Sequence, residues 1–391
     1  MDDVNHVNDL WLRISGPGSD VAPQIISSGH DVDSNSAQVM MTADGGVTSV
    51  WIEYDQPSVV VGPLVSRHWT AAGGWGAIKV IEPSQTIRVR ALRPMADGRA
   101  MLFYGIDVPG APKTTENLFA RLIEADGSVG PSSRMDIPAH GYTTGWGVHS
   151  LVRGNDVVAA WLQEPDTGGF CISSRVFRNG VWSDASCVNA TPASKTTFQP
   201  RLTVGPDAQA MLAWYGGSSI YVSMLDTVTH WSEPEAAGSP DSKEAPYELF
   251  DAAVCKDGSS AIAWGNRSNS GGSLAMRVRS AAGAWGSRVD LARPPAATVE
   301  VLKLSVDDTC NWTAVWSTHD SNADRIFARR LLATSGLQAT TTLADNVALP
   351  FINISGSRYF VGTVALTVEP SGAAIVLWNE QAGAIRWRRL E

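Results

Sequence analysis

One short pattern of apolar and polar positions recurs along the chain. Residues 43–51 read ADGGVTSVW, in which a polar turn precedes a mostly apolar run that ends in an aromatic residue. The pattern returns as ADGRAMLFY, PDAQAMLAW, KDGSSAIAW and PSGAAIVLW. The aromatic residue follows the turn at the same offset in seven places: Trp51, Tyr104, Trp161, Trp214, Trp264, Trp316 and Trp378. The chain is therefore predicted to consist of seven repeats of about fifty residues each.

Each repeat is predicted to contain a β-hairpin at this pattern. Its turn is Asp-Gly, Gly-Asn or Ser-Gly, pairs that tolerate the positive φ angles of a two-residue hairpin loop. The residues before the aromatic, such as AMLA, SAIA and AIVL, are apolar at consecutive positions, as in a strand that is covered on both faces. We expect the aromatic side chains to pack between neighbouring repeats.

Two further strands follow the hairpin. The first carries an arginine, in FARLI, SSRVF, AMRVR and FARRL, and the second opens at another series of aromatic residues. Four short antiparallel strands at this period are typical of a β-propeller blade. We therefore predict an all-β fold, a seven-bladed β-propeller of four-stranded antiparallel blades that forms a single domain over residues 1–391. The second series is Trp75, Trp182, Trp231 and Trp285, with Leu337 in the sixth repeat, and the arginines are Arg121, Arg175, Arg277 and Arg329.

The recurring arginines are expected to hold neighbouring blades together, against an aromatic ring or a carboxylate of the next blade. The two ends of the chain are expected to close the ring. The sequence ends in AIRWRRLE, which matches a third strand, so the last blade lacks its fourth strand. Residues 8–28 are predicted to supply it. Trp11 with Arg13, and Trp387 with Arg389, both fit the third strand of that blade.

Composition and charge narrow the classes of function. The chain has 391 residues, 44% of them hydrophobic, and a formal net charge of -9 without a basic cluster, which excludes a nucleic-acid partner. No apolar run is long enough to span a bilayer, and the amino end MDDVNHVNDL does not resemble an export signal.

The four cysteines favour an oxidising compartment. Cys171 and Cys187 flank the turn RNG, so they are expected to face each other on adjacent strands at a distance that permits a disulfide. Cys255 and Cys310 lie near the inner hairpins of successive repeats, where a bridge between blades is feasible. Two feasible pairs and no odd cysteine predict a secreted or periplasmic protein whose leader is absent from this chain.

The candidate binding surface is the face that receives the loops after the inner aromatic series. Trp146 belongs to neither tryptophan series and lies in the Gly-rich segment PAHGYTTGWGVHS, which is predicted to be a loop. It is expected either to stack on a sugar ring or apolar ligand or to pack over the central channel. The predicted ligand-binding residues are Tyr142, Trp146, His149, Glu53, Tyr54, Glu164, Tyr215, Arg267, His319 and Glu380.

Two acidic segments were considered as calcium sites. Asp31, Asp33 and Asn35 alternate in HDVDSN, and HDSNAD has the same spacing at Asp320, Asn322 and Asp324. Neither segment has the glycine and the later glutamate of an EF-hand loop, so both are interpreted as Asx turns. We expect no cofactor, and calcium is the alternative.

The unit PRLTVGPDAQAMLAWYGGSSIYVSMLDTVTHWSEPEAAG resembles the blades of bacterial seven-bladed propeller lectins in its strand order and in the place of its outer W-S strand. The Asp-Gly turns followed by tryptophan are broadly similar to those of sialidase-type propellers. The chain departs from the sialidase box Ser-x-Asp-x-Gly-x-x-Trp, because its Asp and Gly are adjacent and its tryptophan lies further on. The lectin resemblance implies glycan binding without catalysis.

Three functions follow for comparison. The first is a non-catalytic propeller that binds a glycan or another small polar ligand on its long-loop face. The second is a glycoside hydrolase or lyase that uses face carboxylates such as Glu53, Glu164, Glu248 or Glu380, and a carboxylate pair at catalytic separation would favour it. The third is a protein-interaction scaffold. The sequence identifies neither the ligand nor the oligomeric state.

Overall fold

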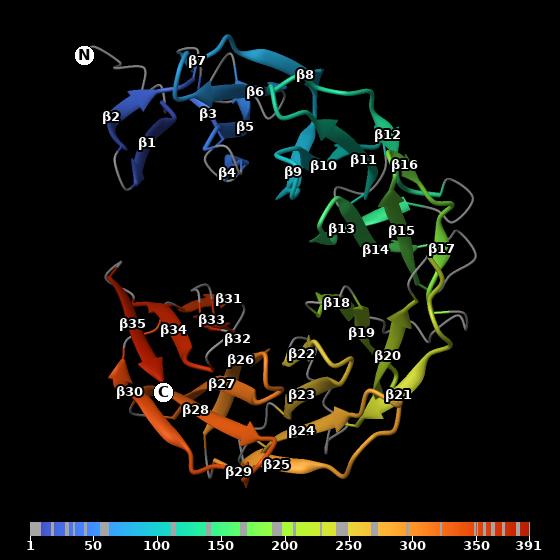
Figure 1. The fold of residues 1–391 in the computed structure, drawn as a ribbon, viewed down its shortest axis with the longest axis vertical. Helices are drawn as coiled ribbons and strands as arrows, with labels where there is room; N and C mark the ends of the chain where they lie inside the picture. The colour runs from blue at the N-terminus through green and yellow to red at the C-terminus, as the bar shows by residue number, and fades with distance from the viewer. Residues whose placement is uncertain are drawn as a thin grey trace. The chain divides into compact units, whose positions relative to one another are not determined.

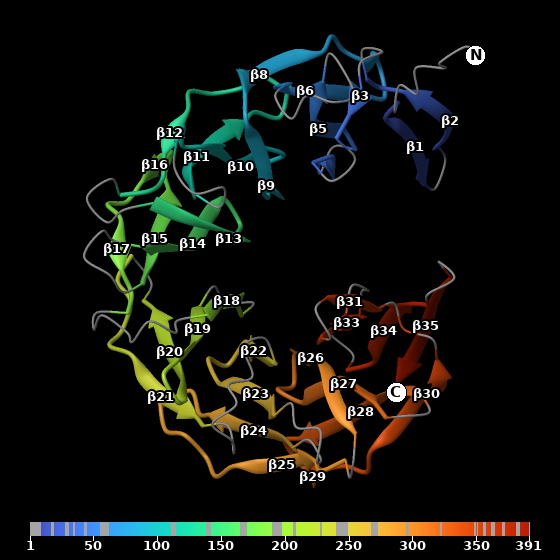
Figure 2. The ribbon, with the colours of Figure 1, turned by 180° about the vertical axis from the view of Figure 1, so that it is seen from behind.

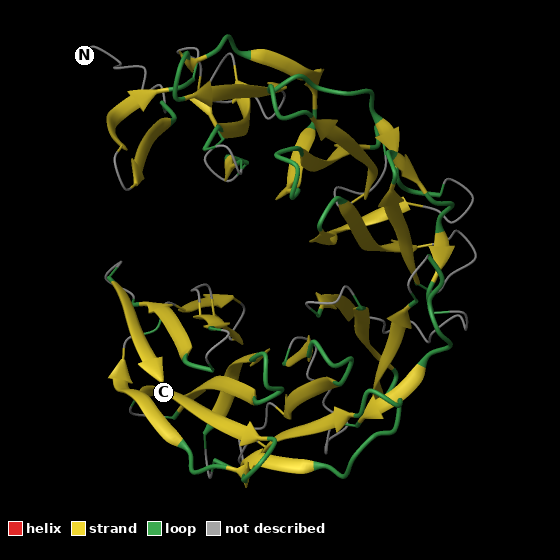
Figure 3. Ribbon diagram, viewed as in Figure 1, coloured by secondary structure: helices red, strands yellow, loops and turns green. Residues whose placement is uncertain are grey.

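Every regular element that the structure describes is a β-strand (Figure 3). The structure is a computed structural model. None of its described residues lies in a helix that is long and apolar enough to cross a membrane. It describes residues 9–390 apart from 17–18, 28–30, 34–35, 43–44, 55–61, 111–114, 138–141, 165–169, 190–197, 206–208, 227–228, 240–248, 267–272, 295–296, 321–322, 348, 350, 355–356, 361–363, 370–371 and 381–383.

All strand pairs are antiparallel, and the chain forms two compact units, Met1–Cys187 and Val188–Glu391 (Figure 1). The first unit contains an amino-terminal hairpin and the sheets of repeats 1 to 3. Its strands are β1 (Trp11–Gly16), β2 (Ser19–Ile25), β3 (Asp31–Val32), β4 (Gln38–Met41), β5 (Val47–Tyr54), β6 (Gly62–Thr70), β7 (Gly74–Trp75), β8 (Lys79–Gln85), β9 (Ile87–Pro94), β10 (Ala100–Asp107), β11 (Thr115–Ile123), β12 (Ser133–Arg134), β13 (Tyr142–Arg153), β14 (Asp156–Glu164), β15 (Cys171–Arg178), β16 (Val181–Trp182) and β17 (Ser186–Cys187).

The second unit contains the sheets of repeats 4 to 7, and Figure 2 shows the same strand order from behind. The first strands of its successive repeats, β18, β22, β26 and β33, lie next to one another. The strands are β18 (Phe198–Val204), β19 (Ala210–Gly216), β20 (Ser219–Leu225), β21 (Glu235–Gly238), β22 (Phe250–Val254), β23 (Ser260–Asn266), β24 (Ser273–Arg279), β25 (Val289–Ala292), β26 (Thr298–Val306), β27 (Trp312–His319), β28 (Asp324–Leu332), β29 (Gly336–Leu337), β30 (Thr341–Val347), β31 (Phe351–Ile354), β32 (Ser357–Phe360), β33 (Val364–Val368), β34 (Ala374–Asn379) and β35 (Ile385–Leu390).

The predicted four-strand order is confirmed in repeats 1 to 6. Repeat 5, for example, runs β22-β23-β24-β25, and the arginine of its third strand lies opposite Ile262, two residues before Trp264. The all-β prediction is therefore confirmed, with sheets of the kind that form propeller blades. A closed ring of seven blades in a single domain stays a prediction.

The repeated turn has the backbone that its glycine predicts. Gly98, Gly258 and Gly372 have φ angles of 85°, 87° and 94°, in the left-handed region where a side chain is strained. Repeat 6 has Cys310 in this place, with φ at 61°. The side chain of Asp307 holds that turn, because its carboxylate accepts hydrogen bonds from the backbone nitrogens of Thr309 and Asn311 at 2.8 and 2.9 Å.

The hydrophobic core lies between successive sheets. One cluster joins Leu64 of repeat 1 to Leu102 of repeat 2, and another joins Met276 of repeat 5 to Trp316 of repeat 6. The inner aromatic series is buried throughout, which confirms its structural role, with exposures of 6% or less at Trp51, Tyr104, Trp161, Trp214, Trp264, Trp316 and Trp378.

The carboxyl-terminal part of the chain departs from the regular repeat. A hairpin, β31-β32, is inserted before repeat 7, which explains why the interval from Trp316 to Trp378 exceeds the others. The sheet of repeat 7 has the three strands β33-β34-β35, so the strand that contains Trp387 is its third strand. Arg389 was predicted to be the repeated arginine of this strand, but the equivalent residue is Arg388. Arg388 lies opposite Val376, two residues before Trp378.

Both predicted disulfides are present. Cys171 and Cys187 are joined with their Cα atoms 5.6 Å apart, and Cys255 and Cys310 with theirs 5.5 Å apart. The first pair lies on adjacent strands as expected, but the two residues are diagonal, since the partner directly opposite Cys187 is Ser173. The second pair links repeat 5 to repeat 6.

Candidate functional site

The recurring arginine of the third strand links several sheets to the sheet before them. Arg277 of repeat 5 donates from Nε to the carbonyl of Gly286 in its own sheet and from Nη1 to the carbonyl of Ala237 in repeat 4. Arg329 bonds Gln338 and Leu291 in the same way, one repeat further on. The arginines are therefore structural in the first instance, as the sequence predicted, although most of their acceptors are carbonyls and not carboxylates.

Between repeats 1 and 2, the acceptor of the repeated arginine is a carboxylate instead of a backbone carbonyl. Glu82 of β8 accepts hydrogen bonds on Oε2 from Nη2 of Arg121 at 2.9 Å and from the hydroxyl of Tyr104 at 3.1 Å. The same hydroxyl lies 2.9 Å from that of Ser132. Side chains of the two sheets thus fill the space between them.

The corresponding space between repeats 4 and 5 is open. A groove of about 400 Å³ lies there, between β21, the segment just before β25 and the ring of Trp264 on β23. Its lining is Ala236, Gly238, Ser239, Trp264, Arg277, Gly286, Ser287 and Arg288.

Gly238 is the reason that the groove is open. It lies opposite Ile220 on β20, as Glu82 lies opposite Leu64 on β6, so the two residues hold equivalent places in their repeats. A Cβ atom at Gly238 would be 2.9 Å from the ring of Trp264, which is too close for an unshifted side chain. The absent side chain lets the indole of Trp264 lie directly against β21 at the edge of the groove.

Arg288 forms the cationic wall of the groove. Its guanidinium carbon lies 5.9 Å from the centre of the Trp264 ring, within range of a cation–π interaction. Its Nε donates to Asp290 at 2.9 Å, which fixes the side chain from the other end. Asp290 also accepts a hydrogen bond from Arg293 at 2.7 Å. The hydrogen bonds from these two arginines, that of Arg293 first, outweigh the effect of burial and hold the pKa of Asp290 below its usual value.

A second ion pair lies beside the groove. Arg279 binds Glu235 through Nη2 at 3.1 Å and Nε at 3.3 Å, and the indole nitrogen of Trp285 donates to the same carboxylate at 3.1 Å. The hydrogen bond from Arg279 is the main reason that the pKa of Glu235 is lowered. Glu235 is therefore ionised at neutral pH and holds β21 against repeat 5.

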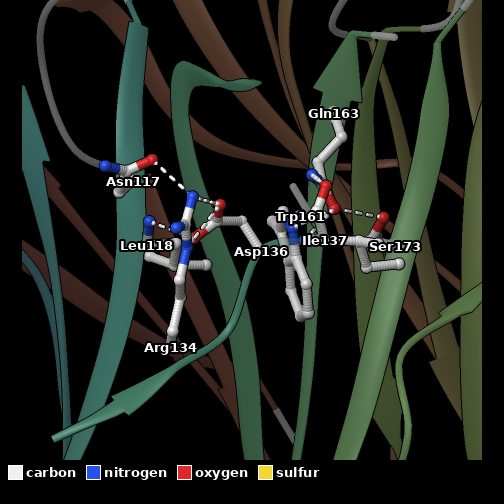
Figure 4. Close-up of polar contacts among 8 residues, drawn as sticks. All are labelled: Asn117, Leu118, Arg134, Asp136, Ile137, Trp161, Gln163 and Ser173. Atoms are coloured by element: carbon white, nitrogen blue, oxygen red, sulfur yellow. Dashed lines mark hydrogen bonds and ion pairs between the residues drawn. The ribbon is translucent and has the colours of Figure 1, made fainter. Parts of the chain in front are cut away.

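A polar network occupies the junction of repeats 2 and 3 (Figure 4). Gln163 of β14 accepts hydrogen bonds on Oε1 from the indole of Trp161 at 3.1 Å and from the hydroxyl of Ser173 at 2.7 Å. Its amide group donates to the carbonyl of Ile137 at 3.1 Å. Asp136, beside it in the chain, pairs with Arg134 at 2.7 Å. Gln163 is fully buried, so its hydrogen bonds join the two sheets.

The predicted face residues that follow the inner aromatics are mostly engaged within the protein. Glu53 was expected on the surface, but only 6% of it is exposed, because its carboxylate accepts a hydrogen bond from the indole of Trp51 at 3.0 Å. Tyr215 is also buried, at 3%, in the core between repeats 4 and 5. The expectation of surface exposure was wrong for both. Tyr54 is half-buried and donates to Asp33 at 3.4 Å, and burial, followed by the Asp33 charge, raises its pKa.

Three other predicted residues remain at the surface or near it. Glu164 is exposed at the end of β14. His319 is half-buried with Nδ1 2.7 Å from Asp324, and Glu380 accepts a hydrogen bond from Arg386 at 3.4 Å. Glu164 belongs to repeat 3, His319 to repeat 6 and Glu380 follows the second strand of repeat 7, so the three residues come from separate repeats.

The segment around Trp146 is not a loop. Tyr142, Trp146 and His149 belong to β13, the first strand of repeat 3, in a stretch where its pairing with β14 shifts register. The loop prediction was wrong because the glycines produce a bulge inside a strand and not a turn between strands. His149 is half-buried, the side chains of Tyr142 and Trp146 lie outside the described residues, as does Arg267, and the ligand-binding role of all four stays a prediction.

The acidic segments considered for calcium make contacts typical of turns. Asp320 accepts a hydrogen bond from the backbone nitrogen of Ala323 at 3.0 Å and pairs with Arg325, as in an Asx turn. Asp324 is bonded by His319 and by the backbone nitrogen of Leu349 at 3.2 Å. The side chain of Asp31 lies outside the described residues, as do Asn35 and Asn322.

Sequence reasoning missed the groove between repeats 4 and 5. Its lining residues come from two repeats and form a groove only where the sheets of repeats 4 and 5 contact each other. A signal was nonetheless present, because aligned outer strands place Arg288 where the other repeats have Ile78, Ser132, Ala185, Pro234 and Thr340.

No protein-family model matches this chain, and no curated protein matches it. Among solved structures it is similar to the BP39L lectin from Burkholderia pseudomallei, with 12% sequence identity, a TM-score of 0.47 and coverage of 90% of this chain and 98% of the lectin. It is also similar to the polysaccharide lyase Uly1, with 12% identity, a TM-score of 0.49 and coverage of 91% and 88%. The intramolecular trans-sialidase from Ruminococcus gnavus is similar at 11% identity, with a TM-score of 0.35 and coverage of 91% and 94%. These likenesses carry no conclusion about the ligand or the chemistry of this chain.

Proposed function

We propose that this chain binds a carbohydrate without transforming it, and that the groove between repeats 4 and 5 is a binding site. The observation that carries the proposal is the combination in one groove of an arginine above an indole ring with two serine hydroxyls at the rim. The serines are Ser239 and Ser287, both exposed.

This combination suits a sugar because a sugar has both apolar C–H faces and many hydroxyl groups. The edge of Trp264 and the alanine and glycine positions give the groove an apolar floor. Arg288 and the serines supply hydrogen-bond donors and acceptors that fix orientation. A shallow site of this volume accommodates one or two sugar rings and leaves the rest of a glycan in solvent.

The lining also favours binding over hydrolysis. Glycoside hydrolysis ordinarily uses two carboxyl groups on either side of the scissile bond. The residues that line the groove include no aspartate or glutamate within the described part of the chain. Among the described carboxylates next to the lining residues in sequence, Glu235 and Asp290 are both held by arginines.

An extracytoplasmic location is part of the proposal. It is supported by two disulfides that use all four cysteines, since such bonds persist mainly in oxidising compartments. Glycans of cell surfaces and of the surrounding medium are accessible there.

A glycan array tests the proposal. The intact protein is expected to retain a defined group of glycans, and Arg288→Ala is expected to weaken that binding by about tenfold or more. Arg325→Ala is the matched control, because it removes the same charge from the surface of the same unit, where Arg325 pairs with Asp320 and Asp345. Turnover of chromogenic glycosides by the intact protein, or array binding that Arg288→Ala leaves unchanged, would contradict the proposal.

A further inference from the structure

The junction of repeats 1 and 2 shows which chemical group fits the groove. There, the Glu82 carboxylate occupies the space between the sheets, where Nη2 of Arg121 and the hydroxyl of Tyr104 bind it. Glu82 and Arg121 are only 13% and 20% exposed, so the pair is largely shielded from water. A carboxylate is thus stably held at this position of the repeat.

The groove has the same elements without that carboxylate. Trp264 takes the place of Tyr104, Arg277 that of Arg121, and Gly238 that of Glu82. Arg277 uses Nε and Nη1 for backbone carbonyls, and its Nη2 makes no hydrogen bond within the described part of the chain. In Arg121, Nη2 is the atom that binds Glu82.

Arg288 compensates for the loss of the tyrosine hydroxyl. An indole ring offers no hydroxyl at the place where Tyr104 donates to Glu82. Arg288, in the place of Ser132, brings a second guanidinium to the same space. Two guanidinium groups on one groove are suited to an oxyanion, since charge-assisted hydrogen bonds to a carboxylate are stronger than neutral ones.

The surrounding charge favours the same ligand. Four arginines lie in or beside the groove; Arg279 pairs with Glu235, and Arg288 and Arg293 pair with Asp290. A local positive field attracts anions and raises their association rate. The arginines are Arg277, Arg279, Arg288 and Arg293.

We infer that the groove binds an acidic sugar through its carboxylate, which has the part toward Arg277 that the Glu82 carboxylate has toward Arg121 between repeats 1 and 2. The inference rests on the proposed function and specifies its ligand class. The carboxylate accepts hydrogen bonds from Arg277 and Arg288, and the sugar ring lies toward Ser239 and Ser287.

Titration calorimetry with a matched pair of oligosaccharides tests the inference. One is an oligogalacturonate, and the other is the same oligosaccharide after reduction of its carboxyl groups to alcohols. We expect the acidic form to bind at least about tenfold more tightly at low salt and to lose this advantage as salt increases. Arg288→Gln, which keeps a polar side chain without charge, should remove the preference, and Arg325→Gln should leave it intact.

The outcomes separate the inference from the proposed function. Equal binding of the two forms would overturn the inference and leave carbohydrate binding in place. Binding of a sulfated neutral oligosaccharide without binding of the oligogalacturonate would also overturn it. Failure of both forms, together with a silent glycan array, would overturn the proposed function itself.

Discussion

Nη1 of Arg277 donates a hydrogen bond to the backbone carbonyl of Ala237 at 3.0 Å, from the third strand of one repeat to the fourth strand of the repeat before it. The acceptor is a main-chain atom, so the bond does not depend on the residue type in the preceding repeat. Ala237 and its neighbours are therefore free to differ between repeats while the sheets keep the same spacing. The groove arises from such a difference, at Gly238.

The first prediction concerns the repeated arginine. Arg329→Ala should lower the free energy of unfolding by about 2 kcal/mol, because the carbonyls of Gln338 and Leu291 lose their donor between packed sheets. Urea denaturation measures the effect. Arg325→Ala is the control, with a smaller expected loss, because the ion pairs of Arg325 with Asp320 and Asp345 lie at the surface. Equal losses in the two variants would contradict the structural role of Arg329.

The second prediction concerns the disulfides. Thiol titration of the denatured, unreduced protein should find no free cysteine, and four free thiols would contradict the extracytoplasmic location. Removal of Cys255 and Cys310, which are 55 residues apart, should destabilise the protein by roughly 4 kcal/mol in the chain-entropy model. Removal of Cys171 and Cys187, 16 residues apart, should cost less, at roughly 3 kcal/mol.

The third prediction concerns acid stability. The pKa of Glu235 is lowered in the folded protein, mainly by its hydrogen bond with Arg279, from an ordinary value of 4.5. The folded state therefore gains stability from this carboxylate above pH 4.5 and loses it as the pH falls through the lower folded pKa. Glu235→Gln should remove that part of the pH dependence, as measured by denaturation at a series of acidic pH values. Identical profiles for the two proteins would contradict the prediction.

The fourth prediction concerns the ends of the chain. Nη1 of Arg67 donates to the carbonyl of Ile26, just after β2, as Arg277 donates to Ala237. This places β2 in the role of a fourth strand preceding repeat 1, and the sheet of repeat 7 has three described strands. Deletion of residues 1–28 should therefore leave an unpaired edge and an aggregation-prone protein. A truncated monomer with an unchanged melting temperature would show that the amino end does not complete the last blade.

The sequence predicted the features that recur at the same position of a strand or turn in several repeats. The turn glycines, the buried aromatics and the third-strand arginine recur at fixed offsets, so their common role was visible without a structure. The two disulfides followed from the place of each cysteine relative to a hairpin. In each case, comparison of the repeats with one another shows the structural role of the residue.

The candidate site was not predictable in the same way. The orientation of Glu53 depends on Trp51, whose indole nitrogen donates a hydrogen bond to the Glu53 carboxylate. The groove depends on a ring of one repeat that meets Gly238 of another. These contacts depend on residues that differ from the common repeat pattern. The contacts become visible only when the side chains of adjacent strands and sheets are placed in space.

The hydrogen bonds that the repeated arginine makes to the neighbouring sheet also have a direction along the chain. Arg67, Arg277, Arg329 and Arg388 all donate to a carbonyl that precedes them in sequence, at Ile26, Ala237, Leu291 and Leu343. A chain that leaves the ribosome amino end first thus exposes each acceptor before the donor that bonds it. Each new sheet can dock on one that is already complete, which limits the time for which an unpaired hydrophobic face is open to other molecules.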